Sequence, residues 1–382
     1  MQKLIPWFFL KSVPGIGNHL FKRLLDRFGS PEKVISAPFE ELAAVQGISN
    51  KIIAAIRNTR VPDHIVPEIK LTFQKGFGII TFSDAAYPAL LREIPDPPPY
   101  LYVYGKLPES KPGMAIVGSR NASSYGRSAA EKLGRDLSLF GINIVSGMAR
   151  GIDTAAHYGA LTAGNPTTAV LGSGLGCIYP PENKDLFHKI SQNGAVISEF
   201  PVNAGPEAYN FPLRNRIICG MSLGTVVVEA AKKSGSLITA RLAAEQGREV
   251  FAVPGSIHSF KSAGTHQLLK DGAKLVAHAR DVLEEFPYMP YFQNACDQTD
   301  SKPNDEVENV GLPALSDREQ EVIKSLGPYP VHIDELSRKL NFKPGQISGI
   351  LLKLELMGMV SQAPGKYFFI NEDQCGKTIN HS

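Results

Sequence analysis

The sequence predicts an α/β protein built around an extended, doubly wound parallel sheet of the Rossmann-like type. From Met114 to about Phe286, short apolar runs alternate with segments of helical character. The apolar runs are nearly continuous rather than alternating, which is typical of parallel strands that helices cover on both faces. In such sheets ligands bind beyond the carboxyl ends of the strands, where helix amino termini present unsatisfied N–H groups.

The elements of this central domain follow one another regularly. The strand-like runs are AIVGS, NIVSG, TTAVLGS, AVISEF, GTVVVEA, EVFAVPG and KLVA. Between them we expect helices near residues 126–140, 152–163, 184–192, 215, 237–246 and 266–270. A Pro-rich passage, IPDPPPYLYVYG, precedes them and is interpreted as an extended connector. The predicted central domain spans residues 75–288.

Residues 1–70 are predicted to form a helical domain. The segments VPGIGNHLFKRLLDRFG and VQGISNKIIAAIR share one layout, a glycine turn followed by a basic amphipathic helix. This layout is typical of helix-hairpin-helix units, whose turn presents backbone N–H groups that can hold a phosphate. Residues 1–60 carry nine Lys and Arg against four acids, a net charge of +5. That charge favours nucleic-acid contact, and it suits equally well a packing module with a solvated basic face.

The chain after the central domain predicts two further parts. Residues 289–313 are polar and acidic and are predicted to form a flexible linker. Residues 314–371 are predicted to form a winged helix, with a capping box at Ser316 and Glu319, two more helices in HIDELSRKL and QISGILLKLELMG, and a hairpin in MVSQAPGKYFFI. Its third helix offers few side chains for reading base edges, so a protein-contact role is supported as well as DNA reading.

Composition limits the class of protein. A net charge of only +3 over 382 residues means that any nucleic-acid surface must be local. The four cysteines lie far apart without CxxC spacing, which argues against a zinc site or a disulfide framework and favours a reducing cytoplasm. The apolar opening LIPWFFLK is short and lacks a cleavage site, so we expect neither a signal peptide nor a membrane span.

Basic residues and glycines follow several predicted strands. Gly118-Ser119-Arg120 follows the first, Arg150-Gly151 lies beyond the second, and Gly172-Ser173-Gly174 follows the third, before Lys184 in YPPENKDLF. The run from Arg214 to Arg216 is placed at the start of a helix, where cations oppose the helix dipole and so favour an anionic guest. Ion pairing of these arginines with Glu199 or Glu229 is the alternative.

The motifs at these strand ends limit which kind of anion can bind there. A dinucleotide cofactor would require GxGxxG at the first turn, where the chain has GSRNAS, and GSGLGC after the third strand is out of register. A GxxxxGK[ST] motif is also missing from the sequence. Repeated basic and glycine features along several strand ends favour a polymer backbone lying across the crevice.

The ordered motifs of the central domain resemble the DNA-processing protein A (DprA/Smf) family over about residues 75–285. They are IVGSR, SGMARGIDTAAH, TAVLGSG, YPPEN, SEFP, FPLRNRIICG, SGSLITARLAAEQGREVFAVPG and GTHQLLKDGAKLV. The flanks resemble variants with a sterile-alpha-motif or helix-hairpin-helix-like domain before it and a winged helix after it. The resemblance implies a protein that binds single-stranded DNA without cutting it, loads the recombinase RecA during natural transformation, and forms a homodimer around His266 to Val276. It implies no catalytic residue, metal or cofactor.

The same resemblance implies a set of DNA-binding residues. Arg120, Lys184, Arg214 and Asn215 would grip consecutive phosphates, followed by Arg216. The glycines would let the DNA strand approach the protein backbone. Tyr179 and Phe211 would either stack on bases or form a wall of the binding site. The predicted set is Gly118, Ser119, Arg120, Gly172, Gly174, Asn183, Lys184, Arg214, Asn215 and Arg216.

Two rival functions remain open at this point. Leu223-Gly224-Thr225 with Glu229 resembles part of the PGGxGTxxE signature of the nucleotide phosphoribohydrolase (lysine-decarboxylase-like) family, so a nucleotide-binding hydrolase is the alternative. The first glycines are replaced and Glu229 lies one residue too far, which argues against catalysis. Asp153, His157 and Glu199 are further acid or base candidates, but no spacing requires that role. A scaffold whose terminal domains contact partners is the other possibility.

Overall fold

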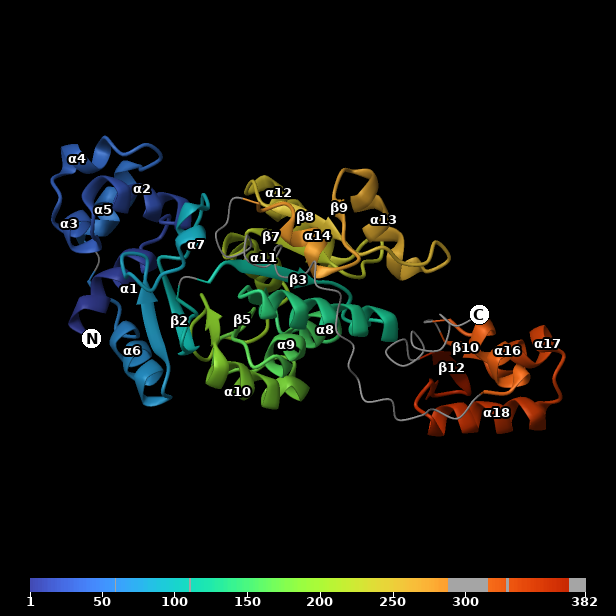
Figure 1. The fold of residues 1–382 in the computed structure, drawn as a ribbon. Coiled ribbons are helices and arrows are strands. Elements are labelled where there is room, and N and C mark those ends of the chain that lie inside the picture. The colour runs from blue at the N-terminus through green and yellow to red at the C-terminus, as the bar shows by residue number, and fades with distance from the viewer. Residues whose placement is uncertain (59, 110, 288–314, 328–329, 371–382) are drawn as a thin grey trace. The chain divides into compact units, whose positions relative to one another are not determined.

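The structure is a computed structural model that describes residues 1–58, 60–109, 111–287, 315–327 and 330–370 (Figure 1). The described residues fall into two compact units. The larger runs through residues 1–287 apart from 123–125, and the smaller contains the residues from 315 onward. Across these ranges, none of the helices combines the length and apolar character needed to cross a membrane.

A nine-stranded sheet lies at the centre of the larger unit, counting the described residues, in the order β1-β2-β6-β5-β4-β3-β7-β8-β9 (Figure 1). Seven strands, from β6 across to β9, are parallel, whereas β1 and β2 form a hairpin that pairs antiparallel with β6. The chain winds outward from β3 to β6, returns to β7 beside β3, and winds outward again to β9. The predicted doubly wound parallel sheet is therefore confirmed, and its switch point lies between β3 and β7. The strands are β1 Gly78–Thr81, β2 Tyr100–Gly105, β3 Gly113–Val117, β4 Asn143–Ser146, β5 Thr167–Val170, β6 Ala195–Ser198, β7 Gly224–Val227, β8 Glu249–Ala252 and β9 Lys274–Leu275.

The central strands are buried on both faces. Every residue of β3 to β7 is buried. Successive residues enter different cores: Ala169 packs in the same cluster as helix α10, and Val170 in the same cluster as helix α11. This explains the continuous apolar runs, since both side-chain directions of a strand need apolar residues. The covering helices are α8 Ser124–Leu139, α9 Ile152–Thr162, α10 Lys184–Asn193, α11 Asn210–Gly220, α12 Gly235–Glu245, α13 Ala263–Lys270 and α14 Ala279–Leu283.

Two local predictions differ from the structure. The YLYVYG end of the presumed connector is strand β2, because the prolines stop at Pro99 and leave a run that pairs with β1 and β6. Helix α11 begins at Asn210 rather than near 215. The buried Asn210 side chain bonds the Gly205 carbonyl at 3.4 Å, and Pro212 fits the first turn, where its missing N–H needs no partner. The helix therefore contains Arg214 and Arg216, as predicted, but both arginines come after its first turn.

The N-terminal helices belong to the same compact unit as the sheet. The two predicted glycine turns have nearly the same backbone, with φ of 91° at Gly15 and 90° at Gly47. Each precedes a helix, α2 Asn18–Phe28 and α5 Asn50–Asn58. Phe8 stacks on Tyr100 of β2 at a ring distance of 4.1 Å, which joins this module to the sheet. The other N-terminal elements are the short 3-10 helix Gln2–Leu4, α1 Ile5–Ser12, α3 Pro31–Ser36, α4 Phe39–Ala43, α6 Ile65–Gln74 and α7 Ala89–Glu93.

The smaller unit is a winged helix, as predicted. Its helices are α16 Asp317–Ser325, α17 Ile333–Leu340 and α18 Pro344–Leu356. The strands β10 Val331–His332, β11 Val360–Ala363 and β12 Tyr367–Ile370 form a sheet in the order β10-β12-β11. The capping box of Ser316 and Glu319 is present at the start of α16. The predicted linker at 289–313 lies outside the described residues.

Candidate nucleic-acid interface

A cavity of about 310 Å³ opens beyond the carboxyl ends of β3, β4 and β5. Four separate chain segments contribute to it: the turns after each of these three strands, and the first part of helix α11. It lies close to the switch point, where sheets of this kind bind ligands. The lining residues are Arg120, Asn121, Gly147, Ala149, Arg150, Gly172, Tyr179, Pro180, Phe211 and Arg214.

Backbone contacts hold the turns after β3 and β4 together. The Ile152 N–H donates to the Ser119 carbonyl at 3.2 Å. Gly151 adopts φ of 76°, and a Cβ on it would lie 2.3 Å from that same carbonyl oxygen. Glycine is therefore needed here for both its conformation and its small size. The packing places Arg120 and Arg150 around one opening.

Arg214 forms the floor of the cavity. Its side chain is buried, and Nη1 donates to the carbonyls of Val170 and, at 2.8 Å, of Gly147. Burial lowers the pKa of Arg214 to about 10, with Asp153 opposing and Arg120 adding to the shift, so the guanidinium stays charged at neutral pH. Its buried Nε has no hydrogen-bond partner within the described residues. A buried cation with an unused donor favours an anion in the cavity.

Aromatic rings form one wall. The Arg120 guanidinium carbon lies 5.0 Å from the centre of the Phe211 ring, and Tyr179 lies against the same ring at 5.7 Å. A Cβ on Gly172 would come within 2.7 Å of Phe211, so this glycine lets the ring approach the strand end. Tyr179 is 39% exposed. The site therefore offers an aromatic face beside three guanidinium groups.

Three of the ten predicted binding residues, Arg120, Gly172 and Arg214, line the cavity. Of the others, Gly118 packs against Ile152, and Gly174 packs against the backbone at Pro201 and Val202. Both positions require glycine because neighbouring atoms leave no room for a Cβ. Ser119 contributes its carbonyl to the turn contact described above, and Asn215 is only partly buried and is not part of the lining.

Asn183 and Lys184 lie at the start of α10. The buried Asn183 amide donates to the Met148 carbonyl at 2.8 Å and to Thr154 Oγ1 at 2.9 Å, which ties this segment to the loop after β4. Lys184 is exposed and does not line the cavity. Asn183 thus positions the loop, and Lys184 is placed outside the opening.

Arg216 faces a different part of the molecule from Arg214. It forms ion pairs with Glu199 and, at 3.2 Å, with Asp96, and it donates to the Asp96 carbonyl at 2.7 Å. The pairing with Glu199 is the alternative that the sequence left open. Lys11 is close enough to Glu199 to affect its titration, so this buried cluster lies beside the N-terminal helices.

The four acid or base candidates of the rival hydrolase reading lie outside the cavity lining. The Asp153 carboxylate accepts N–H bonds from Gly147 at 3.1 Å and Ala149 at 3.3 Å. Burial lowers the pKa of His157 to about 3, which keeps this imidazole neutral. Glu229 is buried against Gly126, and Glu199 pairs with Arg216. His157 Nδ1 is hydrogen-bonded to Thr167 Oγ1 at 2.8 Å, whereas His157 Nε2 and Glu199 Oε1 have no hydrogen-bond partner within the described residues.

Arg150 lines the cavity but was not in the predicted set. The signal was available, since Arg150-Gly151 follows the second strand just as Gly118-Ser119-Arg120 follows the first. Asn121 and Gly147 were missed too. A Cβ on Gly147 would lie 2.4 Å from Arg214 Nη1, a contact that only the folded chain reveals.

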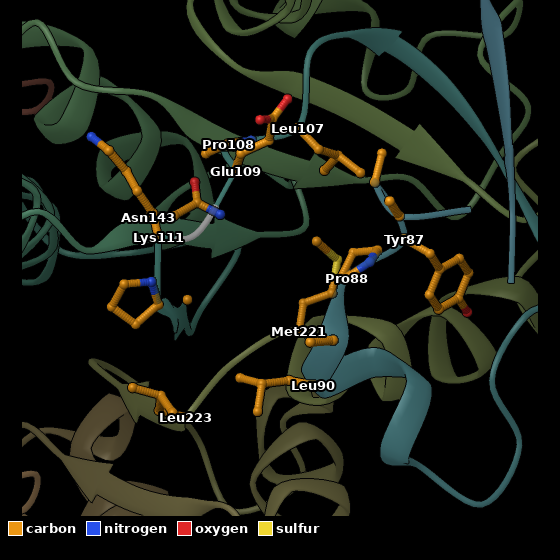
Figure 2. A pocket seen from close by; sticks show the side chains of 15 residues that line it. Tyr87, Pro88, Leu90, Leu107, Pro108, Glu109, Lys111, Asn143, Met221 and Leu223 are labelled. Carbon is orange, nitrogen blue, oxygen red and sulfur yellow. The ribbon is translucent and has the colours of Figure 1, made fainter. Parts of the chain in front are cut away.

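A second, larger cavity of about 830 Å³ lies at the opposite edge of the sheet, where β3, β4 and β7 begin. Figure 2 shows that its labelled side chains are largely apolar, among them Tyr87, Leu90, Met221 and Leu223. Two of its polar groups bond within the protein: the Tyr87 hydroxyl donates to the Pro98 carbonyl at 2.8 Å, and the Asn143 amide donates to Thr168 at 3.0 Å. Its charged residues are Glu109, which pairs with Lys106 at 3.0 Å, and Lys111.

Three family models match this chain. The model described as DNA recombination-mediator protein A matches residues 78–287, which include the whole cavity lining. A DprA winged helix domain matches residues 308–366, and a SAM-like helix-hairpin-helix tandem matches residues 9–59.

Characterised relatives agree with these matches. Protein Smf of Synechocystis is 35% identical over 388 residues, covering 94% of this chain and 96% of the relative. The X-ray structure of DNA processing protein A from Streptococcus pneumoniae superimposes with a TM-score of 0.64 at 37% identity, covering 73% of this chain and 97% of that one. The Helicobacter pylori protein, whose structure describes a single-stranded DNA binding mode, gives a TM-score of 0.50 at 29% identity, covering 56% and 96%. The chain therefore belongs to the DNA recombination-mediator protein A family.

Proposed function

We propose that this protein binds single-stranded DNA along the carboxyl edge of its parallel sheet and leaves the strand intact, as a DNA-processing protein of natural transformation. The observation that carries the proposal is the convergence of Arg120, Arg150 and Arg214 from three separate segments on one cavity with an aromatic wall. Arginine forks bind phosphate oxygens in a bidentate way. The Helicobacter pylori relative, which binds single-stranded DNA, supports the same ligand.

The chemistry of the lining favours a backbone ligand over a reacting one. The cavity lining contains three arginines and no carboxylate. Phosphates would contact the guanidinium groups, while bases would stack on Phe211 and Tyr179, each stacked base being worth about 1–3 kcal/mol. A stacking surface tolerates any base, so we expect little sequence preference. The strand should be recovered uncut after incubation with the protein.

The test compares Arg120→Ala with Lys111→Ala. Both variants lose one exposed cation, but Lys111 lies at the amino edge of the sheet. Arg120→Ala should weaken binding of an oligothymidylate by about tenfold, because a charged hydrogen bond is lost. It should also flatten the slope of log affinity against log salt by about 0.7, because one fewer counterion is released. Fluorescence anisotropy over a salt series measures both quantities.

Lys111→Ala controls for the change in net charge and should leave affinity and slope at the wild-type values. If Arg120→Ala binds as wild type does at every salt concentration, the carboxyl-edge cavity is not the DNA site. A duplex oligonucleotide measured in parallel shows whether single strands are preferred.

We further propose that the protein forms a homodimer through the edge of the sheet around His266 to Val276. The edge strand β9 lies in this range, and its Leu275 is 49% exposed. Ile257 is exposed as well, and so is Phe260, the first residue of the 3-10 helix Phe260–Ser262 before α13. Unpaired strand edges and exposed apolar side chains are typical of surfaces that a partner covers. A monomeric mass at micromolar concentration would contradict this.

Transfer of the bound strand to RecA in the cytoplasm is proposed from the family resemblance. Its measurement is the rate of RecA filament assembly on single-stranded DNA with and without the protein. An unchanged rate would remove RecA loading from the proposed function while leaving strand binding untouched.

A further inference from the structure

Arg150 at the rim of the DNA cavity forms an ion pair with Glu182. Its Nε contacts Glu182 Oε1, and the two side chains are 60% and 48% exposed. The hydrogen bond to Arg150 lowers the pKa of the Glu182 carboxyl, so this carboxylate is ionised at neutral pH. An acidic group therefore neutralises one of the three arginines that line the cavity.

The ion pair is not needed to hold its two loops together. Glu182 lies in the short 3-10 helix Pro181–Asn183, and the next residue, Asn183, is buried and bonds Met148 and Thr154. On the other side, the turn containing Arg150 is fixed by the bond from Ile152 to Ser119. Exposed ion pairs contribute little to stability, so Arg150 can exchange its partner without disturbing the fold.

Glu182 and a DNA phosphate are alternative partners for the same guanidinium. Both present oxygen atoms to an arginine fork, and both cannot occupy one side of it. We propose that Arg150 is a phosphate-binding residue and that Glu182 is a built-in competitor, which the strand must displace in order to bind. This inference rests on the proposed function and adds a mechanism that weakens binding of any strand that contacts Arg150.

The proposal has a signature in the salt dependence of binding. In the wild type, binding of a phosphate to Arg150 releases a cation from the DNA but frees the Glu182 carboxylate, which attracts a cation in its place. In Glu182→Gln no carboxylate is freed, so the cation released from the DNA is not offset. An ion pair with a purely structural role would not change the salt slope when its acid is neutralised.

The experiment measures oligothymidylate affinity of full-length Glu182→Gln over a salt series. We expect affinity at low salt to rise about twofold to fivefold, because a competing ion pair is removed. The salt slope should steepen by about 0.7. The matched control is Glu109→Gln, which removes one acid from the exposed Lys106–Glu109 pair, away from the DNA cavity, and changes net charge equally. This control should bind as wild type does.

The double variant Arg150→Ala/Glu182→Gln completes a double-mutant cycle with the wild type and the two single variants. If Glu182 acts through Arg150, neutralising it in the Arg150→Ala background should bring no gain in affinity. A full gain in affinity in the double variant would overturn the proposal. Wild-type affinity and salt slope in Glu182→Gln, with weak binding by Arg120→Ala, would overturn it as well. In that last case strand binding at the cavity still stands. If Arg120→Ala also binds normally, the proposed function falls together with this inference.

Discussion

The two cavities at opposite edges of the same sheet differ in the way that matters for function. The amino-edge cavity is the larger, at about 830 Å³, and its lining is mostly apolar, with one acid, Glu109, and one base, Lys111. The carboxyl-edge cavity holds about 310 Å³, yet three arginines from separate segments meet there, one of them buried with an unused donor.

Strand direction, rather than cavity volume, therefore identifies the edge of the sheet that binds DNA. In parallel strands the following turns all emerge at one edge, so short turns can bring charged side chains from distant sequence positions together. The amino edge receives the ends of crossover helices and the starts of strands instead. Here apolar and proline residues form most of the lining of its cavity.

The largest expected effect separates the two arginines of α11. Arg216→Ala should lower the free energy of unfolding by about 3 kcal/mol, because it removes the ion pair of Glu199, whose side chain is only 13% exposed. Arg214→Lys keeps the charge but loses the guanidinium, whose Nη1 donates to two carbonyls, and should weaken single-strand binding by about tenfold. Urea unfolding and anisotropy measure the two effects.

Arg216→Ala should retain wild-type affinity at temperatures where it remains folded. Lost DNA binding in folded Arg216→Ala, with normal binding in Arg214→Lys, would reverse the assignment of the two arginines.

A smaller effect comes from one glycine at each edge. In Gly147→Ala the new Cβ would lie 2.4 Å from Arg214 Nη1, so the buried guanidinium would have to leave its carbonyl partners and DNA affinity should fall several-fold. In Gly113→Ala it would lie 2.2 Å from the backbone oxygen of Met221. That backbone cannot move away easily, so we expect a loss of about 1–3 kcal/mol in unfolding free energy.

Affinity of folded Gly113→Ala should match that of the wild type. Equal losses of DNA affinity in Gly147→Ala and Gly113→Ala would contradict the assignment of DNA binding to the carboxyl edge of the sheet.

Much of the fold was predictable because local patterns report it. Continuous apolar runs identified the buried parallel strands, and the capping box at Ser316 marked the start of α16. Strand β2 was missed because its YLYVYG run directly follows a proline tract, and its pairing partners lie far away in the sequence.

The site was predictable in part for a physical reason. Turn position identified Arg120 and Gly172, since residues after parallel strands share an edge. Arg214 and Arg216 are two positions apart on a helix, so they point to different sides, and sequence alone did not reveal which one faces the cavity. Arg216 pairs with Glu199 and Asp96, and these two residues come close to it only in the folded sheet.

The most direct measurement is a crystal structure of the protein with bound oligothymidylate. The account predicts phosphate oxygens in hydrogen-bond contact with Arg120 and Arg150 at the carboxyl edge, Glu182 released from Arg150, and no nucleotide in the amino-edge cavity. A strand bound elsewhere, with both arginines contacting only protein and solvent, would contradict it.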